Sequence, residues 1–251
     1  MIKWRLTWPA EVSLSFGQTS GHALKRQLQF VHIGKCGGST VEKFLSLSPV
    51  VREKYSSFFE SHINGAVIDS NCDYLFCLRN PISRAFSAFE WRKKLVLEEE
   101  LPDQVQRFPG ERKVLRKYLS LGAMARSLYL SDGRLDQAVA RDFRAVHHLR
   151  ESISFYCQPL LGVLTPGNIL GVVCQETLAA DCARLLGVDV SEVRERSNAS
   201  KRQIEQDLDP EAINNLRRFL VEDYQCVAAL WSLGALSQQQ FWRVMMSSVE
   251  Q

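Results

Sequence analysis

A chain of 251 residues is long enough to bury one sizeable hydrophobic core, and a single α/β domain with insertions is the simplest organisation for it. Its hydrophobic share of 45% and charged share of 24% are ordinary for a globular protein. The net charge of +3 is too small to indicate a nucleic-acid or membrane-surface binder, although it suits a small anionic ligand.

Cysteine usage and hydropathy both favour an intracellular protein. The seven cysteines are an odd number, with no CxxC pair or Cys/His cluster at metal-binding spacing, so the sequence predicts buried free thiols and no metal site. No apolar run approaches the ~20 residues that a bilayer requires. The opening stretch "MIKWRLTWPAEVSLSF" lacks the apolar core of a signal peptide. We expect a cytoplasmic protein without stable membrane insertion, and a removed membrane anchor stays open as an alternative.

The first half of the chain predicts two buried strands, each followed by a helix. Residues 1–27 have no clear pattern and form an unassigned lead-in. The apolar run "LQFVHI" (28–33) predicts a strand, and "STVEKFLS" (39–46) has helical spacing after a hydroxyl N-cap. A second strand, "DYLFCLR" (73–79), precedes the helical stretch "ISRAFSAFEWRKK" (82–94), which has Pro81 near its first turn.

The second half is mostly helical. Residues 95–111 break the regularity and are expected to form a mobile insertion, whereas 112–163 have a helical pattern. "NILGVVC" (168–174) predicts a third buried strand, followed by an amphipathic helix over 175–187. A polar loop over 190–202 then leads to one long helix over 209–231. This alternation favours an α/β fold, a single domain with a central parallel sheet flanked by helices on both faces.

The loop after the first strand, within "FVHIGKCGGST" (30–40), carries the strongest functional signal. A glycine turn between a strand and a helix N-terminus directs several backbone N–H groups to one point, where the helix dipole also favours negative charge. Gly37 and Gly38 let the backbone approach an oxyanion closely. Ser39 and Thr40 add hydroxyl donors, and Lys35 adds a full charge. The loop predicts a phosphate or sulfate site, with a plain turn and a surface lysine as the alternative.

The order of residues in this loop resembles that of sulfotransferases. A Walker A loop reads G-x-x-x-x-G-K-[ST], whereas here the lysine precedes the glycines. This order is similar to the loop that binds the 5′-phosphosulfate of 3′-phosphoadenosine 5′-phosphosulfate (PAPS), usually "H-I-P-K-T-G-G-T-S". The similarity is greatest to the carbohydrate branch that includes heparan 2-O-sulfotransferases and their bacterial relatives. Gly34 replaces the usual proline, and Cys36 replaces Thr or Ala. The resemblance implies that PAPS is held by Lys35, Cys36, Gly37, Gly38, Ser39 and Thr40.

A second stretch, "LFCLRNPISRAFSAF" (75–89), resembles the family's motif for the 3′-phosphate. In that motif a strand ends in Arg, Asp/Asn-Pro follows, and the next helix carries Ser. The resemblance assigns Arg79 and Ser87 to the 3′-phosphate of PAPS, with Asn80 in place of the commoner Asp. A guanidinium at a strand end and a hydroxyl two helical turns later can hold one phosphate together.

Weaker similarities extend over most of the chain. "SNASKR" (197–202) resembles a late loop that would close over the nucleotide with Asn198, Ser200 and Lys201, and a solvated loop is the alternative. The implied organisation is a P-loop-like sulfotransferase domain over 28–233 and a helical tail over 234–251. Residues 95–130 are expected to form much of the acceptor side, because variable insertions near a fixed cofactor site usually carry specificity.

Sulfuryl transfer needs a base for the acceptor hydroxyl, and five histidines compete for this role. His62, in "FFESHINGAVID" (58–69), lies between the two motifs, where the resembled branch has its histidine base. An imidazole with a pKa near neutrality suits the task. Glu60 is the second candidate. His32 is expected to be structural or to lie behind the site, and His147 and His148 to pack or lie on the surface.

The sequence therefore predicts an enzyme that transfers a sulfuryl group in line from PAPS to an acceptor hydroxyl, with Lys35 offsetting charge on the leaving phosphate. A glycan or small glycoconjugate is the expected acceptor, and no metal is predicted. One alternative is a non-catalytic module that binds PAPS or its product. The other is a nucleotide kinase, disfavoured by the loop order and the missing magnesium carboxylates. A basic cluster over 107–119 could attract an anionic glycan, but a solvated helix face is favoured for Arg107, Arg112, Lys113, Arg116 and Lys117. The oligomeric state is left open.

Overall fold

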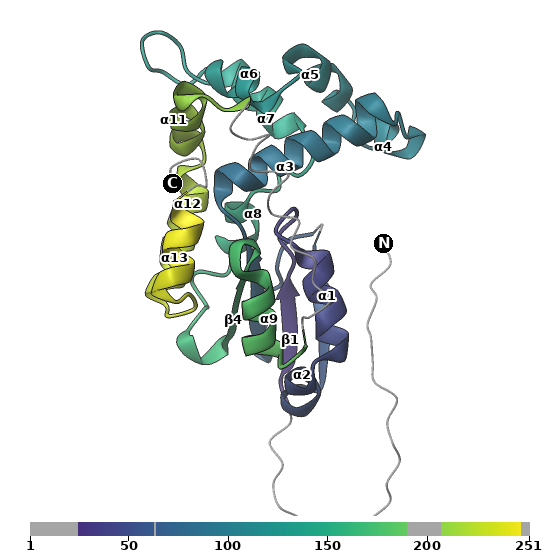
Figure 1. Cartoon of the computed structure of the whole chain (residues 1–251), viewed down its shortest axis with the longest axis vertical. Coiled ribbons are helices and arrows are strands. Elements are labelled where there is room, and N and C mark those ends of the chain that lie inside the picture. The colour runs from purple at the N-terminus through teal and green to yellow at the C-terminus, as the bar shows by residue number, and fades with distance from the viewer. Residues whose placement is uncertain (1–24, 63, 190–206, 247–251) are drawn as a thin grey trace, which may run out of the picture.

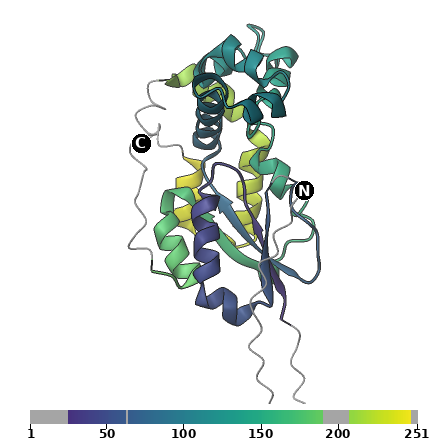
Figure 2. The same ribbon diagram turned by 90° about the vertical axis from the view of Figure 1, so that its right-hand side faces the viewer.

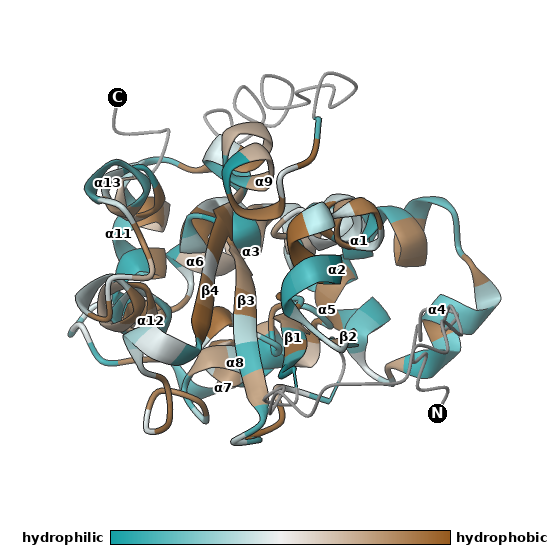
Figure 3. Cartoon of the chain, turned by 90° about the horizontal axis from the view of Figure 1, so that it is seen from below, coloured by the Kyte–Doolittle hydropathy of each residue, from teal (hydrophilic) through white to brown (hydrophobic). Residues whose placement is uncertain are grey.

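The structure, a computed structural model, describes residues 25–62, 64–189 and 207–246. Four parallel strands form its central sheet: β1 (Gln27–Val31), β2 (Ser57–Ser61), β3 (Cys72–Leu78) and β4 (Ile169–Cys174). Their order is β2-β1-β3-β4, as Figure 3 shows, and every residue of β3 is buried. The predicted α/β architecture with a central parallel sheet is confirmed.

Helices cover both faces of this sheet. On one face lie α1 (Gly38–Leu47), α2 (Pro49–Lys54) and α9 (Leu178–Leu186), and on the other lie α8 (Ile153–Cys157) and α12 (Val221–Ser232) (Figures 2 and 3). The helix α13 (Gln238–Met245) packs on α12. Apolar side chains of the strands and of these helices form one continuous core. This core fixes the ends of the strands from which the candidate site is built.

A second hydrophobic cluster holds a helical region beyond one end of the sheet, at the top of Figure 1. The helix α3 (Pro81–Lys93) runs into this region and continues as a π-helix over Lys94–Glu98. Packed with it are α4 (Pro102–Arg107), α5 (Glu111–Tyr118), α6 (Leu121–Arg126), α7 (Gln137–Ala145) and α11 (Pro210–Phe219). Because α3 begins directly after β3, it connects the sheet to this region.

Two sequence predictions about elements are wrong, and one strand had not been predicted. Residues 57–61 form a strand, β2, although their mixed polarity gave no strand signal. Residues 95–111, predicted as an irregular insertion, are largely helical, because α3 continues without a break into the π-helix and α4 follows it. The helix predicted over 209–231 is two helices, since α11 ends at Phe219 and α12 begins at Val221. The helix α13 lies within the predicted helical tail.

The sheet topology places the predicted site residues together. Because β1 pairs with β2 on one side and β3 on the other, the chain leaves β1 and β2 in opposite directions across the sheet. Ligands of open parallel sheets bind beyond the carboxyl ends of the strands at such a reversal. The loop of Lys35 follows β1, His62 follows β2, and Arg79 follows β3. Within the described ranges, no helix is both long and apolar enough to cross a bilayer.

Candidate functional site

The loop after β1 presents unbonded backbone N–H groups at the start of α1. Among the described residues, no group accepts a hydrogen bond from the N–H of Lys35, Gly37, Gly38 or Ser39. The first two N–H groups of α1 therefore point out of the helix with no acceptor, where the helix dipole favours an anion. The side chains of Ser39 and Thr40 also have no hydrogen-bond partner in this part of the structure. The predicted oxyanion loop thus has its donors available.

Both glycines of the turn are required by their surroundings. Gly37 has a φ of 83°, a backbone conformation that side-chain-bearing residues rarely adopt. A Cβ at Gly37 would overlap the side chain of Gln175, and a Cβ at Gly38 would overlap the ring of His32. The loop is therefore packed closely between β4 and the end of β1, which fixes the direction of its N–H groups.

Lys35 occupies an unusual backbone position within this loop. Its φ is 69°, in the left-handed region where non-glycine residues are uncommon and strain is often functional. Its Nζ lies 4.4 Å from the ring centroid of Trp91, on α3. Burial and the positive charge of Arg79 lower the pKa of Lys35 to about 8. The ammonium group of Lys35 thus lies beside the glycine turn, where it experiences the positive charge of Arg79.

Cys36 does not contribute to the loop in the way that the resemblance implied. Its side chain is fully buried in the core, and its backbone N–H donates to the carbonyl of Ile33 at 3.3 Å. Burial raises the pKa of the Cys36 thiol to about 12, so the thiol is protonated at neutral pH. We therefore remove Cys36 from the residues expected to bind PAPS. Its place between Lys35 and Gly37 turns the side chain inward.

Arg79 lies next to the loop, at the end of β3. Its Nη1 is 3.5 Å from the carbonyl oxygen of Lys35. Burial lowers the pKa of Arg79, and the neighbouring carboxylate of Glu176 opposes this shift. Arg79 and Lys35 therefore put two positive charges beside the unbonded N–H groups, as an anion carrying more than one charge requires.

Asn80 links the end of β3 to the start of α3 and to the C-terminal part of α13. Its Oδ1 accepts from the N–H of Ser83 at 3.0 Å and caps α3, and its Nδ2 donates to the carbonyl of Val244 at 2.8 Å. Its own N–H donates to Oε1 of Glu176 at 2.8 Å. Asn80 thus has a structural role that an amide fulfils fully. Ser87, two turns along α3, is half-buried, and its hydroxyl is unbonded within the described ranges.

His62 lies at the end of β2, oriented by the neighbouring strand. Its Nδ1 is 2.9 Å from the carbonyl oxygen of His32, and its ring stacks on that of His32 with centroids 4.2 Å apart. A carbonyl can only accept, so Nδ1 carries the proton and Nε2 keeps a lone pair. Burial lowers the pKa of His62 below its usual value, and the charge of His32 adds to this effect. A neutral imidazole with a free Nε2 is the form that a general base needs.

Glu60, the second candidate for the base, is already engaged. Its carboxylate forms an ion pair with Nδ1 of His32. Burial would raise the pKa of Glu60, but the hydrogen bond and charge of His32 outweigh it, so the pKa lies below the usual value. A carboxylate in this state is a weak base. Glu60 instead holds the ring of His32 against His62.

A further histidine, His148, lies at the site, where sequence reasoning did not place it. His147 and His148 follow α7 and stack on each other with centroids 4.2 Å apart, and the ring of His148 lies 6.2 Å from that of His62. Both are largely buried, with 9% and 12% of their side chains exposed. The adjacent His-His pair in a helical stretch is typical of packing, and no local pattern links residue 148 to residue 34 or 62.

Potential metal ligands gather twice among the described residues, in His32/Glu60/His62 and in His147/His148/Glu151. In the first group Nδ1 of His32 is bound to Glu60, and in the second Nε2 of His147 lies 3.0 Å from Oε2 of Glu151. The guanidinium of Arg150 also donates to Oε1 of Glu151 at 3.2 Å, and the buried guanidinium of Arg84 donates to the backbone carbonyl of the same residue. The carboxylates of Glu60 and Glu151 are thus already paired with histidine or arginine side chains, and cations lie beside the second group, so we assign a metal to neither.

The other residues singled out from the sequence are those of the late loop and of the basic cluster over 107–119. Asn198, Ser200 and Lys201 fall outside the described residues. The basic side chains of α5 are partly neutralised, because Arg112 and Arg116 pair with Glu100, and Lys117 pairs with Asp142. This agrees with a solvated helix face.

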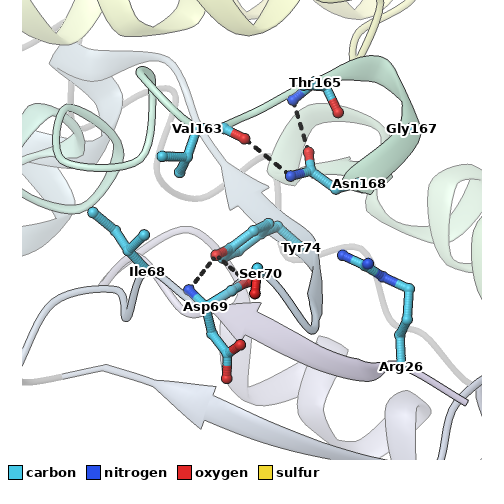
Figure 4. A pocket seen from close by; sticks show the side chains of 9 residues that line it. All are labelled: Arg26, Ile68, Asp69, Ser70, Tyr74, Val163, Thr165, Gly167 and Asn168. Carbon is cyan, nitrogen blue, oxygen red and sulfur yellow. Dashed lines mark hydrogen bonds between the residues drawn. The ribbon is translucent and has the colours of Figure 1, made fainter. Parts of the chain in front are cut away.

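A pocket of about 480 Å³ opens at the opposite end of the sheet, before the first residues of β1, β3 and β4 (Figure 4). Its polar groups are satisfied locally: Tyr74 bonds to the loop of Asp69, and Asn168 bonds to Val163 and Thr165. Arg26, at its edge, pairs with Asp73. No chemistry converges there comparable to that at the carboxyl ends of the strands.

The geometry therefore brings together an oxyanion loop, two cations and a neutral imidazole at the carboxyl ends of β1, β2 and β3. The free N–H groups lie at the start of α1, and the Nε2 of His62 lies on the neighbouring strand. Comparison with known proteins finds no matching family model, no similar curated protein and no similar solved structure.

Proposed function

We propose that this protein is a PAPS-dependent sulfotransferase that acts on an acceptor hydroxyl, with a carbohydrate as the expected acceptor class. The observation that carries this proposal is that two features lie together at the carboxyl ends of the strands. One is the unbonded N–H groups with Lys35 and Arg79, and the other is His62 with its free Nε2. A phosphate-binding module needs only the first feature. A group-transfer enzyme with a hydroxyl acceptor needs both.

On the donor side, the loop and Lys35 bind the 5′-phosphosulfate. As the bond between sulfur and the bridging oxygen breaks, its electron pair stays on the phosphate, and Lys35 with the N–H groups of α1 stabilises that charge. Arg79 and Ser87 bind the 3′-phosphate, in accordance with the motif that they share with the family. The loop order favours this donor over a nucleoside triphosphate, because the lysine precedes the glycines.

On the acceptor side, His62 accepts the proton of the attacking hydroxyl at Nε2. Its Nδ1–H stays on the His32 carbonyl throughout, so the ring keeps one orientation as it becomes positively charged. Glu60, which pairs with His32, lies close enough for its negative charge to stabilise the imidazolium of His62. Holding the hydroxyl oxygen and the sulfur in line supplies the remaining part of the rate enhancement.

The proposal is tested in two stages with the full chain. Calorimetry first compares adenosine 3′,5′-diphosphate with adenosine 5′-phosphate and with ATP. Transfer from PAPS labelled in its sulfate is then measured against a panel of neutral glycans, anionic glycans and small alcohols and phenols. We expect selective binding of the 3′,5′-diphosphate and label in one acceptor class.

The outcomes separate the proposal from its alternatives. Preference for ATP would replace it with the nucleotide kinase. Tight and selective binding of the 3′,5′-diphosphate, with no transfer to any acceptor and no release of sulfate, would leave only a binding module. If a Lys35→Ala variant transfers labelled sulfate at the wild-type rate, the reaction takes place at another site of the protein.

A further inference from the structure

His148 is the buried side chain at this site whose position the mechanism above does not use. Its φ is 53°, so a residue with a side chain is held in the left-handed region. Its carbonyl oxygen accepts from Nη2 of Arg84 at 2.8 Å. The same guanidinium donates through Nε to the carbonyl of Gly34 at 3.0 Å and bonds to the carbonyl of Glu151. Arg84, only 1% exposed, thus ties the backbone of His148 to the oxyanion loop.

The imidazole of His148 is packed directly on Gly34. A Cβ added at Gly34 would lie 2.8 Å from Nδ1 of His148 and 3.6 Å from Cε1 of His62. Both rings therefore border the same side of the loop, one residue before Lys35. Any side chain at position 34, including the proline that is usual in the resembled loop, would have to displace the ring. Gly34 leaves the room that His148 occupies.

The two nitrogens of His148 differ in their surroundings. Its Nδ1 is buried and has no hydrogen-bond partner, because the nearest carboxylate oxygen, Oε2 of Glu151, is 3.9 Å away and already lies 3.0 Å from His147. Its Nε2 is also unpartnered but is not enclosed. A buried N–H without an acceptor is the costlier arrangement, which places the single proton of the neutral ring on Nε2.

We propose that His148 is a second catalytic histidine, whose Nε2–H donates a hydrogen bond to the sulfuryl group as it passes from the loop to the acceptor oxygen. The inference rests on the proposed function and names one further group that touches the transferring atoms. It follows from the positions of the two rings, since the sulfuryl group travels between the phosphate held at the loop and the oxygen held at His62.

A neutral imidazole suits this role better than an imidazolium. Burial, the neighbouring His147 and the charge of Arg84 lower the pKa of His148 to about 2, so it stays uncharged and cannot act as the base. A neutral imidazole can act as an electrophilic hydrogen-bond donor while a separate group moves the proton. His62 and His148 thus have different tautomers and different tasks.

The test uses transfer to water, so that it does not depend on the identity of the acceptor. In that reaction the bond from sulfur to the phosphate oxygen breaks, with its electron pair going to the phosphate, and a bond from sulfur to the water oxygen forms. The water proton goes to His62, and the products are hydrogen sulfate and adenosine 3′,5′-diphosphate. Release of sulfate from PAPS is measured, together with the affinities for PAPS and for the diphosphate product.

The variants are chosen for the backbone at position 148. His148→Asn tolerates a positive φ but does not reach the place of Nε2, whereas His148→Gln restores an N–H donor near it. We expect His148→Asn to lower sulfate release by about 10²-fold. The affinity for the diphosphate, which has no sulfuryl group, should stay unchanged, and His148→Gln should recover most of the loss. The matched control is His147→Asn, the same change at the adjacent buried histidine, whose atoms are not among the three nearest to a Cβ at Gly34.

Each result decides the inference. Unchanged sulfate release in His148→Asn, or an equal loss in His147→Asn with a matching fall in the thermal midpoint, would show that His148 only packs. If the wild type binds both nucleotides but releases no sulfate, the inference is decided by the two binding affinities of His148→Asn. A contact between His148 and the sulfuryl group then requires that this variant bind PAPS more weakly than the wild type does and bind the diphosphate equally well. If the wild type binds neither nucleotide, the proposed function fails and the role of His148 falls with it.

Discussion

The Nδ1 of His62 lies 2.9 Å from the carbonyl oxygen of His32, so the end of β1 determines the tautomer of the ring at the end of β2. The two strands are paired in parallel, with Val31 opposite Ser61. His32 and His62 each directly follow the last residue of their strand, and their rings stack. The direction of the free Nε2 of His62 therefore depends on the register between β1 and β2, because the hydrogen bond that orients the ring crosses from one strand end to the other.

Replacement of His62 by alanine should abolish transfer while sparing nucleotide binding. In the proposed mechanism the base faces the acceptor, whereas the phosphates are held by the loop and by Arg79. We expect turnover to fall by about 10²–10⁴-fold, the usual contribution of a positioned base. Sulfate transfer and calorimetry with adenosine 3′,5′-diphosphate are measured on the same preparation. Full turnover would move the role to another group, with Glu60 tested next, and collapse of nucleotide binding would make His62 a support of the loop.

The pH dependence of kcat/KM for PAPS should be bell-shaped. His62 must be neutral, and burial places its pKa below the ordinary histidine value, so the rate should rise with pH through a transition below about 6.5. The groups facing this ring are His32 at the end of β1, Glu60 on β2, and His148 and Glu151 after α7. Lys35 must be charged, so the rate should fall through its pKa of about 8. His62→Ala should lose the acid limb and keep the alkaline one. An unchanged acid limb would contradict the assignment.

Replacement of Lys35 by alanine should affect turnover far more than folding. Lys35 lies at the mouth of the loop with its ammonium over Trp91, where its contribution to stability is small. Stabilising charge on the leaving phosphate is typically worth about 10²–10³ in rate. Turnover is measured beside the thermal midpoint, with Lys43→Ala on α1 as a control for loss of one charge. Near-normal turnover in a folded variant would remove Lys35 from the mechanism.

Arg79 should determine the preference for a 3′-phosphate. Adenosine 3′,5′-diphosphate should bind much more tightly than adenosine 5′-phosphate, because the guanidinium and the Ser87 hydroxyl have a partner only in the former. Arg79→Gln should remove most of this difference, since charge-assisted hydrogen bonds contribute about 1.5–3 kcal/mol. Calorimetry with both nucleotides measures the ratio in wild type and variant. Equal affinities in the wild type would refute the 3′-phosphate assignment, and a preserved ratio in the variant would place that site elsewhere.

Much of this arrangement could be predicted from local sequence. Strands β1, β3 and β4 are short apolar runs, buried almost throughout, and hydrophobic runs of that length indicate such strands. The turn between β1 and α1 was predictable because Gly37 and Gly38 follow an apolar run and precede a helical pattern, and its role in binding an oxyanion stays a prediction. Strand β2 was missed because its residues, with the sequence SFFES, alternate at an edge of the sheet and are only partly buried.

The roles of individual side chains depend on long-range contacts that no local pattern records. Cys36 points into the core because the turn at Lys35 reverses its direction, and sequence spacing cannot show that. Arg84 looks like a helix-surface charge, yet it is buried and bonds to three backbone carbonyls far along the chain. His148 reaches the site through its backbone bond to that guanidinium and through the packing of its ring on Gly34. Most helices and strands were therefore predictable, whereas the contacts that join Gly34, Arg84 and His148 were not.

The packing of Gly34 against His148 gives the last prediction. A methyl group at Gly34 would lie 2.8 Å from Nδ1 of His148, closer than real Cβ contacts, so the imidazole must move. Its backbone has no positive φ, and its carbonyl can still accept from Arg84, so Gly34→Ala should fold. We expect a loss of sulfate release close to that of His148→Asn, with nucleotide affinity nearly unchanged. Gly162→Ala, where a Cβ meets open space, is the matched control.

The double variant Gly34→Ala/His148→Asn distinguishes this from an independent effect on the loop. If the methyl group acts by displacing the imidazole, it has nothing left to displace once the imidazole is gone. The two losses should then be strongly non-additive, and the double variant should be about as active as His148→Asn alone. Losses that multiply would mean that Gly34 serves the loop by itself and that the contact with His148 is incidental. Sulfate release measured for the four proteins under one set of conditions completes the cycle.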